Sequence, residues 1–359
     1  MLLLSFSGNS QITLNTTMTP AQYVQNVLLG PGNVVSNITF NGSAAAANTV
    51  QNNVASFTSP APFPMSAGLL MTTNIASDAI GPNNSASQGG TPGPSVNNDP
   101  DLGLIAGGAV TSGAIIEFDF VAGSGFSFSY IFGSDEYPEW APPNASVNDV
   151  FGFFLSGPGI AGGQGFVNNA INIARLPNNT QVSIDNVNPV TNTAFYVNNG
   201  GGAGWGTTIE YDGTTTLLTA SPTLVCGTTY HMKLAVANTS DDAWGSAVFI
   251  QSGSFVTGSS ISAGPNQAIC TTASGIVQLA GVLSSITGQV WSTSGTGTFS
   301  SPNSPTATYT PSAADIAAGS VTITYTGNGL CSVVPLTSTM TLTFLNPTVT
   351  VTPASTTHC

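Results

Sequence analysis

The chain has 359 residues, more than one ordinary β-sandwich needs, so two domains are expected. Its hydrophobic content of 41% is enough for packed cores and argues against disorder. Arg175 and Lys233 are its two basic residues against 15 acidic ones, and the formal net charge is −13. Two cations cannot neutralise a nucleic acid or an anionic membrane surface, so neither is expected as a partner. A metal cation is the counter-charge that such a chain would most readily recruit.

The first thirty residues contain an apolar segment and a helix. Residues 1–11 change from apolar to polar, which fits either the end of a signal peptide or an ordinary first strand. Thr19 is suited to cap a helix, Pro20 to its first turn and Gln22 to complete a capping box, and Gly30 would end it. No run of residues approaches the roughly 18 apolar residues of a membrane span, so none is expected in this chain.

Strand patterns dominate after the helix. Three segments, residues 116–120, 126–132 and 230–236, carry an aromatic or aliphatic side chain at every second position. This period of two is that of an antiparallel strand with one buried face. Residues 12–257 are therefore predicted to form a large all-β sandwich, lectin-like or of the jelly-roll kind, with one short N-terminal helix.

A second, smaller domain is predicted where the composition changes, near residue 258. Beyond this point Asp315 is the only acidic residue, Ser and Thr become frequent, and Trp291 is the expected core aromatic. Residues 262–346 have the length of an immunoglobulin-like or PKD-like sandwich. Residues 347–359 are predicted to begin a further repeat.

The four cysteines lack the close pairs that bind zinc. In an oxidising compartment we expect Cys270 and Cys331 to form a disulfide within the second domain. Cys359 follows Cys270 at the distance of one module and is predicted to be the first cysteine of the next repeat. Cys226 has no evident partner in the sequence and is predicted to be a buried free thiol.

The densest polar cluster follows the aromatic strand that ends near residue 134. Three carboxylates stand within five residues there, and an amide and a fourth carboxylate open the next strand pattern. Calcium binds about six to eight oxygens from carboxylates, amides and carbonyls, so these residues and acids of distant loops are candidate ligands. The candidate set is Asp135, Glu136, Glu139, Asn148, Asp149, Asp241, Asp242, Asp99 and Asp101. The alternative interpretation is a solvated acidic loop whose carboxylates cap turns.

Three loop tryptophans, Trp140, Trp205 and Trp244, are candidate ligand-binding residues, because they could stack on sugars or contact a partner protein. They could equally close over an end of the sandwich. A catalytic centre is not predicted. Glu136 and Glu139 could be imagined as the acid and base of a glycosidase, but adjacent acids are common in turns and no catalytic base is evident.

Several ordered blocks of sequence resemble the choice-of-anchor L domain over roughly residues 12–256. The blocks are GLLMTT (68–73), GPNNS (81–85), DPDL (99–102), FGSDEY (132–137), NDVFGFFLSG (148–157), TYHMKLA (229–235) and SAVFI (246–250). Residues 262–345 resemble the immunoglobulin-like or PKD-like repeats that often follow in long surface adhesins of Bacteroidota. The resemblance implies export and a place on the bacterial cell surface or in the extracellular matrix. Family members often carry an acid where this chain has Gly245; if that position binds a metal, Asp241 and Asp242 must compensate.

Together these features predict an extracellular, non-catalytic surface protein that acts in adhesion. A calcium-ordered acidic loop would present a surface that binds a glycan or a protein. The alternative is a structural protomer that binds copies of itself in an extracellular filament or sheath, since few charged residues guard the strand edges. A glycoside hydrolase is the third and weakest hypothesis.

Overall fold

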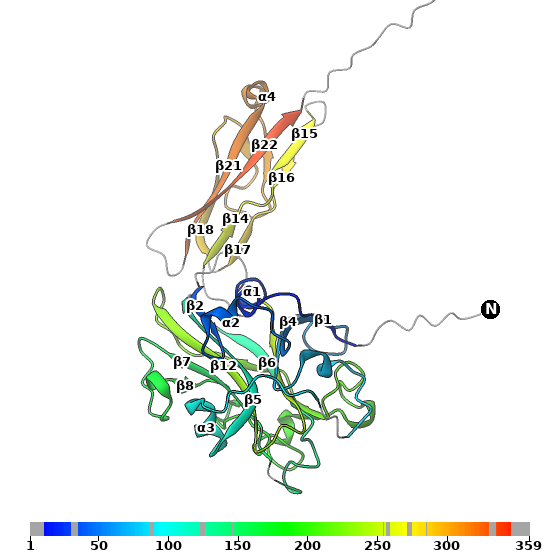
Figure 1. Cartoon of the computed structure of the whole chain (residues 1–359). Helices are drawn as coiled ribbons and strands as arrows, with labels where there is room; N and C mark the ends of the chain where they lie inside the picture. The colour runs from blue at the N-terminus through cyan, green and yellow to red at the C-terminus, as the bar shows by residue number, and fades with distance from the viewer. Residues whose placement is uncertain are drawn as a thin grey trace, which may run out of the picture. The chain divides into compact units, whose positions relative to one another are not determined.

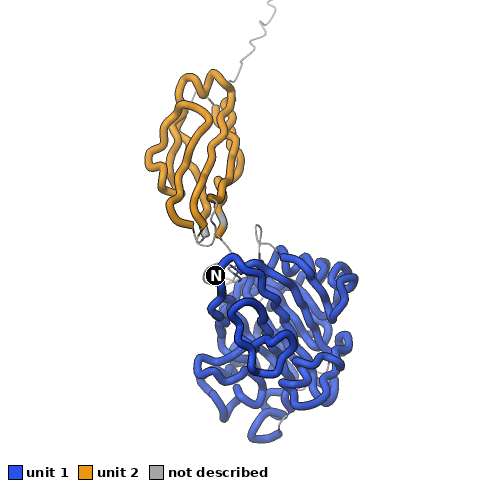
Figure 2. The backbone as a smooth tube through the Cα atoms, turned by 90° about the vertical axis from the view of Figure 1, so that its left-hand side faces the viewer, with its two compact units in different colours: residues 1–257 blue, residues 258–359 orange. Residues whose placement is uncertain are grey.

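The computed structural model describes residues 11–29, 35–86, 90–122, 126–145, 147–253, 255, 259–270, 275–284, 286–329 and 335–345. The chain divides into two compact units, residues 1–257 and residues 258–359 (Figure 2). Each unit has a hydrophobic core of its own.

Unit 1 contains two antiparallel sheets (Figure 1). The larger has the strand order β1-β3-β4-β13-β6-β10-β9, with β11 also paired to β6. Its strands are β1 (Thr13–Asn15), β3 (Val54–Thr58), β4 (Ala67–Thr72), β6 (Phe128–Ser134), β9 (Tyr196–Asn198), β10 (Gly213–Thr215), β11 (Leu218–Ala220) and β13 (Ser246–Gln251). The smaller has the order β2-β5-β12-β7-β8. Its strands are β2 (Val35–Phe40), β5 (Val110–Val121), β7 (Val150–Ser156), β8 (Ile171–Asn172) and β12 (Thr229–Thr239).

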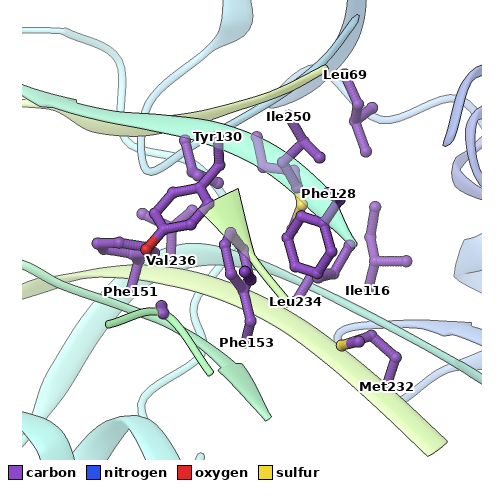
Figure 3. Close-up of a cluster of buried hydrophobic side chains, with 14 of the residues drawn as sticks. Leu69, Ile116, Phe128, Tyr130, Phe151, Phe153, Met232, Leu234, Val236 and Ile250 are labelled. Carbon is purple, nitrogen blue, oxygen red and sulfur yellow. The ribbon is translucent and has the colours of Figure 1, made fainter. Parts of the chain in front are cut away.

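The main core of unit 1 lies between the two sheets. Along β6, Phe128, Tyr130 and Phe132 point into this core, whereas Ile131 belongs to a separate cluster on the outer face. Phe151 and Phe153 of β7 meet them from the other sheet (Figure 3). Burying each aromatic ring contributes about 2–3 kcal/mol, so this layer supplies much of the stability of unit 1. The predicted all-β sandwich is confirmed.

Both sheets of unit 1 are also covered on their outer faces. On the larger sheet, Phe63 and Trp205 pack over Phe249 and its neighbours in a second cluster. On the smaller sheet, Leu102 of helix α3 packs over alanines and aromatics of β12 and β7. Burial on both faces explains why β7 and β13 carry apolar residues at nearly every position rather than at alternate ones.

The predicted N-terminal helix is present. Thr19 caps α1 (Pro20–Tyr23) in a capping box with Gln22, and a π-turn from Val24 to Leu28 continues it. The sequence predicted one helix, but further short helices occur in the described residues: α2 (Ala44–Ala47), α3 (Pro100–Ala106), α4 (Ala313–Ala318) and the 3-10 turns η2 (Ala76–Ala79), η3 (Val167–Asn169), η4 (Thr193–Phe195) and η5 (Gly200–Gly202). None of the helices in the described ranges is long and apolar enough to cross a membrane.

Unit 2 is also built of strands. Its sheets have the orders β15-β22-β21-β18, β16-β20-β19 and β14-β17, and β15 runs parallel to β22. The strands are β14 (Ser260–Ser262), β15 (Gln267–Cys270), β16 (Val277–Gln278), β17 (Val282–Ser284), β18 (Ile286–Thr293), β19 (Thr298–Phe299), β20 (Thr308–Thr310), β21 (Ser320–Gly329) and β22 (Leu336–Leu345). Trp291 is buried and stacks on Tyr325 with ring centroids 3.9 Å apart.

The cysteines do not follow the sequence prediction. Cys270 is an exposed free cysteine, so the predicted bridge to Cys331 is not formed. Cys270 pairs with Leu345, the last residue of β22. Cys226 is disulfide-bonded rather than a free thiol. Cys331 and Cys359 themselves lie outside the described residues.

Candidate functional site

The acidic segment after β6 continues the ladder of that strand by one residue. The backbone N–H of Asp135 donates to the carbonyl of Gly245 at 3.0 Å, beyond the paired ends of β6 and β13. Asp135 and Glu136 both lie in the turn that follows β6. Their side chains lie near different acids, Asp135 near Glu210 and Asp212 and Glu136 near Asp149 and Asp241, although the sequence predicted one site for both.

Glu136 belongs to an inner group of acids with Asp149 and Asp241. Asp149 is 1% exposed and accepts hydrogen bonds from the backbone N–H of Thr239 at 2.9 Å and from the hydroxyl of Ser246 at 2.7 Å. Glu136 is 1% exposed, and no described residue donates to its Oε2. Burial raises the pKa of Glu136 to about 8, with repulsion from Asp149 and Asp241 adding to it. Burial likewise raises the pKa of Asp149 to about 7.

Asp135 belongs to an outer group with Glu210 and Asp212. Its Oδ1 accepts the backbone N–H of Asp212 at 3.3 Å, and its carboxyl meets that of Glu210. Asp212 accepts from the amide of Asn83 at 2.9 Å through Oδ1. No donor among the described residues reaches Asp212 Oδ2 or either carboxylate oxygen of Glu210, although both side chains are at most 4% exposed. This group holds three acids but few donors.

The pKa values of the outer group show the same deficit of donors. Burial raises the pKa of Asp135 well above its usual range, and the nearby charges of Glu210 and Asp212 add to this. Burial raises the pKa of Glu210 to about 7 and that of Asp212 to about 6. The sequence analysis missed Glu210 and Asp212. Their spacing of two residues around Tyr211 was a usable signal, because it places both on one side of an extended segment.

Two of the candidate tryptophans form a pair beside these acids. Trp140, 39% exposed, stacks on Trp244 with ring centroids 4.9 Å apart and an interplanar angle of 26°. The backbone N–H of Trp140 donates to the carbonyl of Glu136 at 2.9 Å, which fixes the turn that carries the ring. Trp205 does not join them, because it packs edge-on against Phe63 in the outer cluster of the larger sheet, with ring centroids 5.5 Å apart.

Asp99 and Asp101 lie away from both acidic groups. Asp99 caps α3 with its side chain, and both carboxylates bind Lys233, the Nζ of which is 2.8 Å from Asp101 and also contacts Asp99. Lys233 and Thr239 lie six residues apart on β12, which corresponds to about 20 Å along the strand. The candidate calcium set therefore loses this pair, since both carboxylates already bind a lysine.

Three more candidate ligands have other contacts. Asn148 accepts the backbone N–H of Asp185 at 3.1 Å, and Asp242 accepts that of Ser112 at 3.1 Å. Glu139 is exposed and lines a cavity of about 320 Å³ with Asp212. In the part of the chain that the structure describes, no three His, Cys, Asp or Glu side chains already stand in the arrangement of a metal site.

The model of the choice-of-anchor L domain matches residues 11–256, which is nearly all of unit 1. The chain belongs to the choice-of-anchor L domain family. It is therefore a surface-associated protein. A search of curated proteins finds no match for the chain.

In the choice-of-anchor L domain of this chain, Gly245 lies close to the side chain of Asn74. A Cβ atom on this glycine would lie 2.6 Å from the amide nitrogen of Asn74, so no side chain fits without a shift of that residue. Asn74 is 2% exposed, and no described residue donates to its Oδ1. Asn74 thus occupies the space that an acidic side chain at Gly245 would need.

Proposed function

We propose that the protein acts in adhesion at the bacterial cell surface, where its choice-of-anchor L domain binds a glycan through Trp140 and Trp244. The observation that carries this proposal is the stacked and partly exposed tryptophan pair, held on a turn after β6. Indole rings stack on the apolar faces of sugar rings and lose little conformational entropy when they bind.

The charges around the pair favour a neutral glycan. Glu139, Asp241 and Asp242 are exposed acids close in sequence to the two tryptophans, and the chain has a formal net charge of −13. A uronic acid or a sulfated sugar would be repelled at such a surface, whereas a neutral polysaccharide would not.

A calcium ion at the inner acidic group would order this surface. Glu136, Asp149 and Asp241 come from three different segments, and Glu136 also holds the turn of Trp140 through its carbonyl. If all three carboxylates bound one calcium ion, their mutual repulsion would be removed. The ion would also fix the three segments relative to one another. Backbone carbonyls and water would complete the coordination sphere.

Affinity electrophoresis in gels that contain neutral polysaccharides (β-glucan, xylan and mannan) tests the proposal. We expect at least one of these to retard the full chain. The variant Trp140→Ala should bind on the order of tenfold more weakly, because one stacking ring is worth about 1.4 kcal/mol or more. Val190→Ala removes another exposed apolar side chain, 56% exposed, and serves as the matched control.

Two results would count against the proposal. Equal retardation of Trp140→Ala and Val190→Ala would show that the tryptophan pair is not the binding surface. No retardation by any of the three polysaccharides would contradict binding of these neutral glycans. Repeating the gels with a chelator tests the calcium ion separately, because unchanged retardation would remove calcium from the proposal and leave the tryptophans.

A further inference from the structure

We propose that Asp135, Glu210 and Asp212 form a calcium site of their own, apart from the group of Glu136. The carboxyl groups of Asp135 and Glu210 meet there, and Asp135 accepts the backbone N–H of Asp212. The independent observation is Glu210: it is 4% exposed, its polar neighbour is another acid, Asp135, and no described N–H or hydroxyl group donates to either of its oxygens. Asp212 Oδ2 is a further buried oxygen without such a donor.

The chain cannot supply the positive charge that this group needs. Buried carboxylates are stable when they are paired, hydrogen-bonded or protonated. The two cations of the sequence are used elsewhere, since Lys233 binds Asp99 and Asp101, and Arg175 donates to Gln164 and to backbone carbonyls. The counter-charge must therefore come from solvent, as protons or as a metal ion.

The oxygen set and its surroundings fit calcium. The side-chain acceptors of the group are the hard oxygens of three carboxylates, and calcium accepts irregular sets of such ligands. The cavity of about 320 Å³ that Asp212 lines together with Asn83 and Glu139 gives an ion and its water ligands access to the group. Binding requires the Asp135–Glu210 contact to open around the ion, which is a change of side-chain rotamers.

This site is separate from the inner acidic group of the proposed function. Asp135 and Glu136 are neighbours in the turn that follows β6, but their side chains lie near different acids. The raised pKa of Glu136 comes from burial, then Asp149 and Asp241, whereas the acids that affect Asp135 are Glu210 and Asp212. A variant of one group should therefore leave the other intact.

Calorimetric titration of the full chain with calcium chloride at pH 7.5 tests the site. With both groups binding, we expect two calcium ions per chain for the wild type and one each for Glu210→Gln and Glu136→Gln, with different ions lost. Millimolar calcium should raise the melting temperature of the wild type by roughly 5 °C relative to a chelator. In Glu210→Gln the rise in melting temperature should be smaller, because the contribution of the Asp135–Glu210–Asp212 site is lost. Glu136→Gln should keep that contribution. Asp212→Asn provides the same test if Glu210→Gln does not fold.

The remaining outcomes separate this site from the proposed function. One ion that is lost in Glu210→Gln but kept in Glu136→Gln would support the site and reject calcium in the inner group. One ion that is kept in Glu210→Gln but lost in Glu136→Gln would overturn the proposed site. No bound calcium, together with melting temperatures in chelator that fall as the pH rises from 5 to 8, would mean that Asp135 and Glu210 share protons, and would overturn it as well. Binding of magnesium without calcium would overturn the assignment of the ion.

Discussion

Two regions of the choice-of-anchor L domain bury acidic side chains, and they do so in opposite ways. Asp99 and Asp101 lie at the start of α3 and bind the ammonium group of Lys233, which is itself only 6% exposed. Glu210 and Asp212 are buried beside Asp135, and no described N–H or hydroxyl group donates to either oxygen of Glu210 or to Oδ2 of Asp212. The first region carries its own counter-charge, and the second must obtain one from solvent.

This difference explains why counting acids in the sequence did not locate the site. Charge density is similar in both regions, but a nearby lysine on a neighbouring strand makes the first a structural ion pair. Only the second region has buried carboxylate oxygens without hydrogen-bond donors, which a ligand could bind. Acids are therefore candidate ligands when their oxygens lack donors, and not merely when they cluster.

Replacing Lys233 tests whether the first region depends on its own counter-charge. Lys233→Met should destabilise unit 1 by about 3–5 kcal/mol, because it leaves Asp99 and Asp101 buried without a counter-charge. Urea unfolding of the full chain at pH 7 measures this. Arg175→Met is the matched control; it removes the other cation, which is less buried, and should cost only about 1 kcal/mol. Equal effects of the two substitutions would show that the ion pair of Lys233 has no special role.

Neutralising one acid in each region should change the stability of the protein in opposite directions. In a chelator at pH 8, Glu210→Gln should stabilise the protein by on the order of 2 kcal/mol, because it removes a buried charge that lacks donors. Asp101→Asn should destabilise it by on the order of 2 kcal/mol, because it weakens a buried ion pair. The sign of the change in the urea midpoint is the measurement. Two changes of the same sign would contradict the distinction between the regions.

Asp315 in unit 2 is a buried carboxylate with its donors in place. It accepts from the backbone of Thr296 and Ser312 and from the hydroxyl of Tyr309, at 2.7–3.0 Å. Burial alone would raise its pKa, but these hydrogen bonds outweigh it and lower the pKa to about 2. Its stabilisation is therefore present above the unfolded-state pKa of about 3.9 and is lost as the pH falls towards 2.

Asp315→Asn should cost about 1–2 kcal/mol at pH 7 and almost nothing at pH 2. Thermal unfolding of unit 2, followed by the fluorescence of its tryptophan at both pH values, measures the difference. A loss of the same size at pH 2 would mean that the hydrogen bonds of the carboxylate are not what stabilises this unit.

His231 gives the smallest expected effect. It lies on the outer face of β12, with its ring nitrogens 3.1 Å from Glu117 and 2.8 Å from Asp119, and these two acids raise its pKa against the effect of burial. Because the histidine pKa is raised in the folded state, the stabilisation it provides is fully present below the unfolded-state pKa of about 6.5. This stabilisation is lost as the pH rises through the folded-state pKa. His231→Gln should cost about 1 kcal/mol or less at pH 5.5, and less at pH 9. A cost that does not change with pH in urea unfolding would contradict this.

The sequence predicted the strands well because their pattern is local. The alternation around Phe118, Phe128 and Leu234 marks the faces that meet in the core, and the capping box of Thr19 marks the start of α1. Helix α3 was missed, although Asp99 and Pro100 form a helix start, because its seven residues are too few to show a helical period.

The candidate site was predicted only in part because its geometry is tertiary. Glu136 and Asp149, which lie near each other, were both among the candidate ligands predicted from the sequence. The approach of Glu210 to Asp135 depends on a contact between segments that are distant in sequence. The partnership of Lys233 with Asp99 was equally out of reach, since it requires the pairing of β12 within the sheet and the position of α3.

The burial of Lys233 also affects how readily trypsin-like proteases cleave the folded protein. Such enzymes cleave after lysine or arginine, and the chain offers them only Arg175 and Lys233. Lys233 lies in β12, which is hydrogen-bonded on both sides by β5 and β7, so cleavage there requires the smaller sheet to open. Arg175 sits in a turn that its own guanidinium ties to the carbonyls of Asn172 and Asn179. The rate of tryptic cleavage after Lys233 would thus report the opening of one strand in unit 1, in a background where unit 2 cannot be cut.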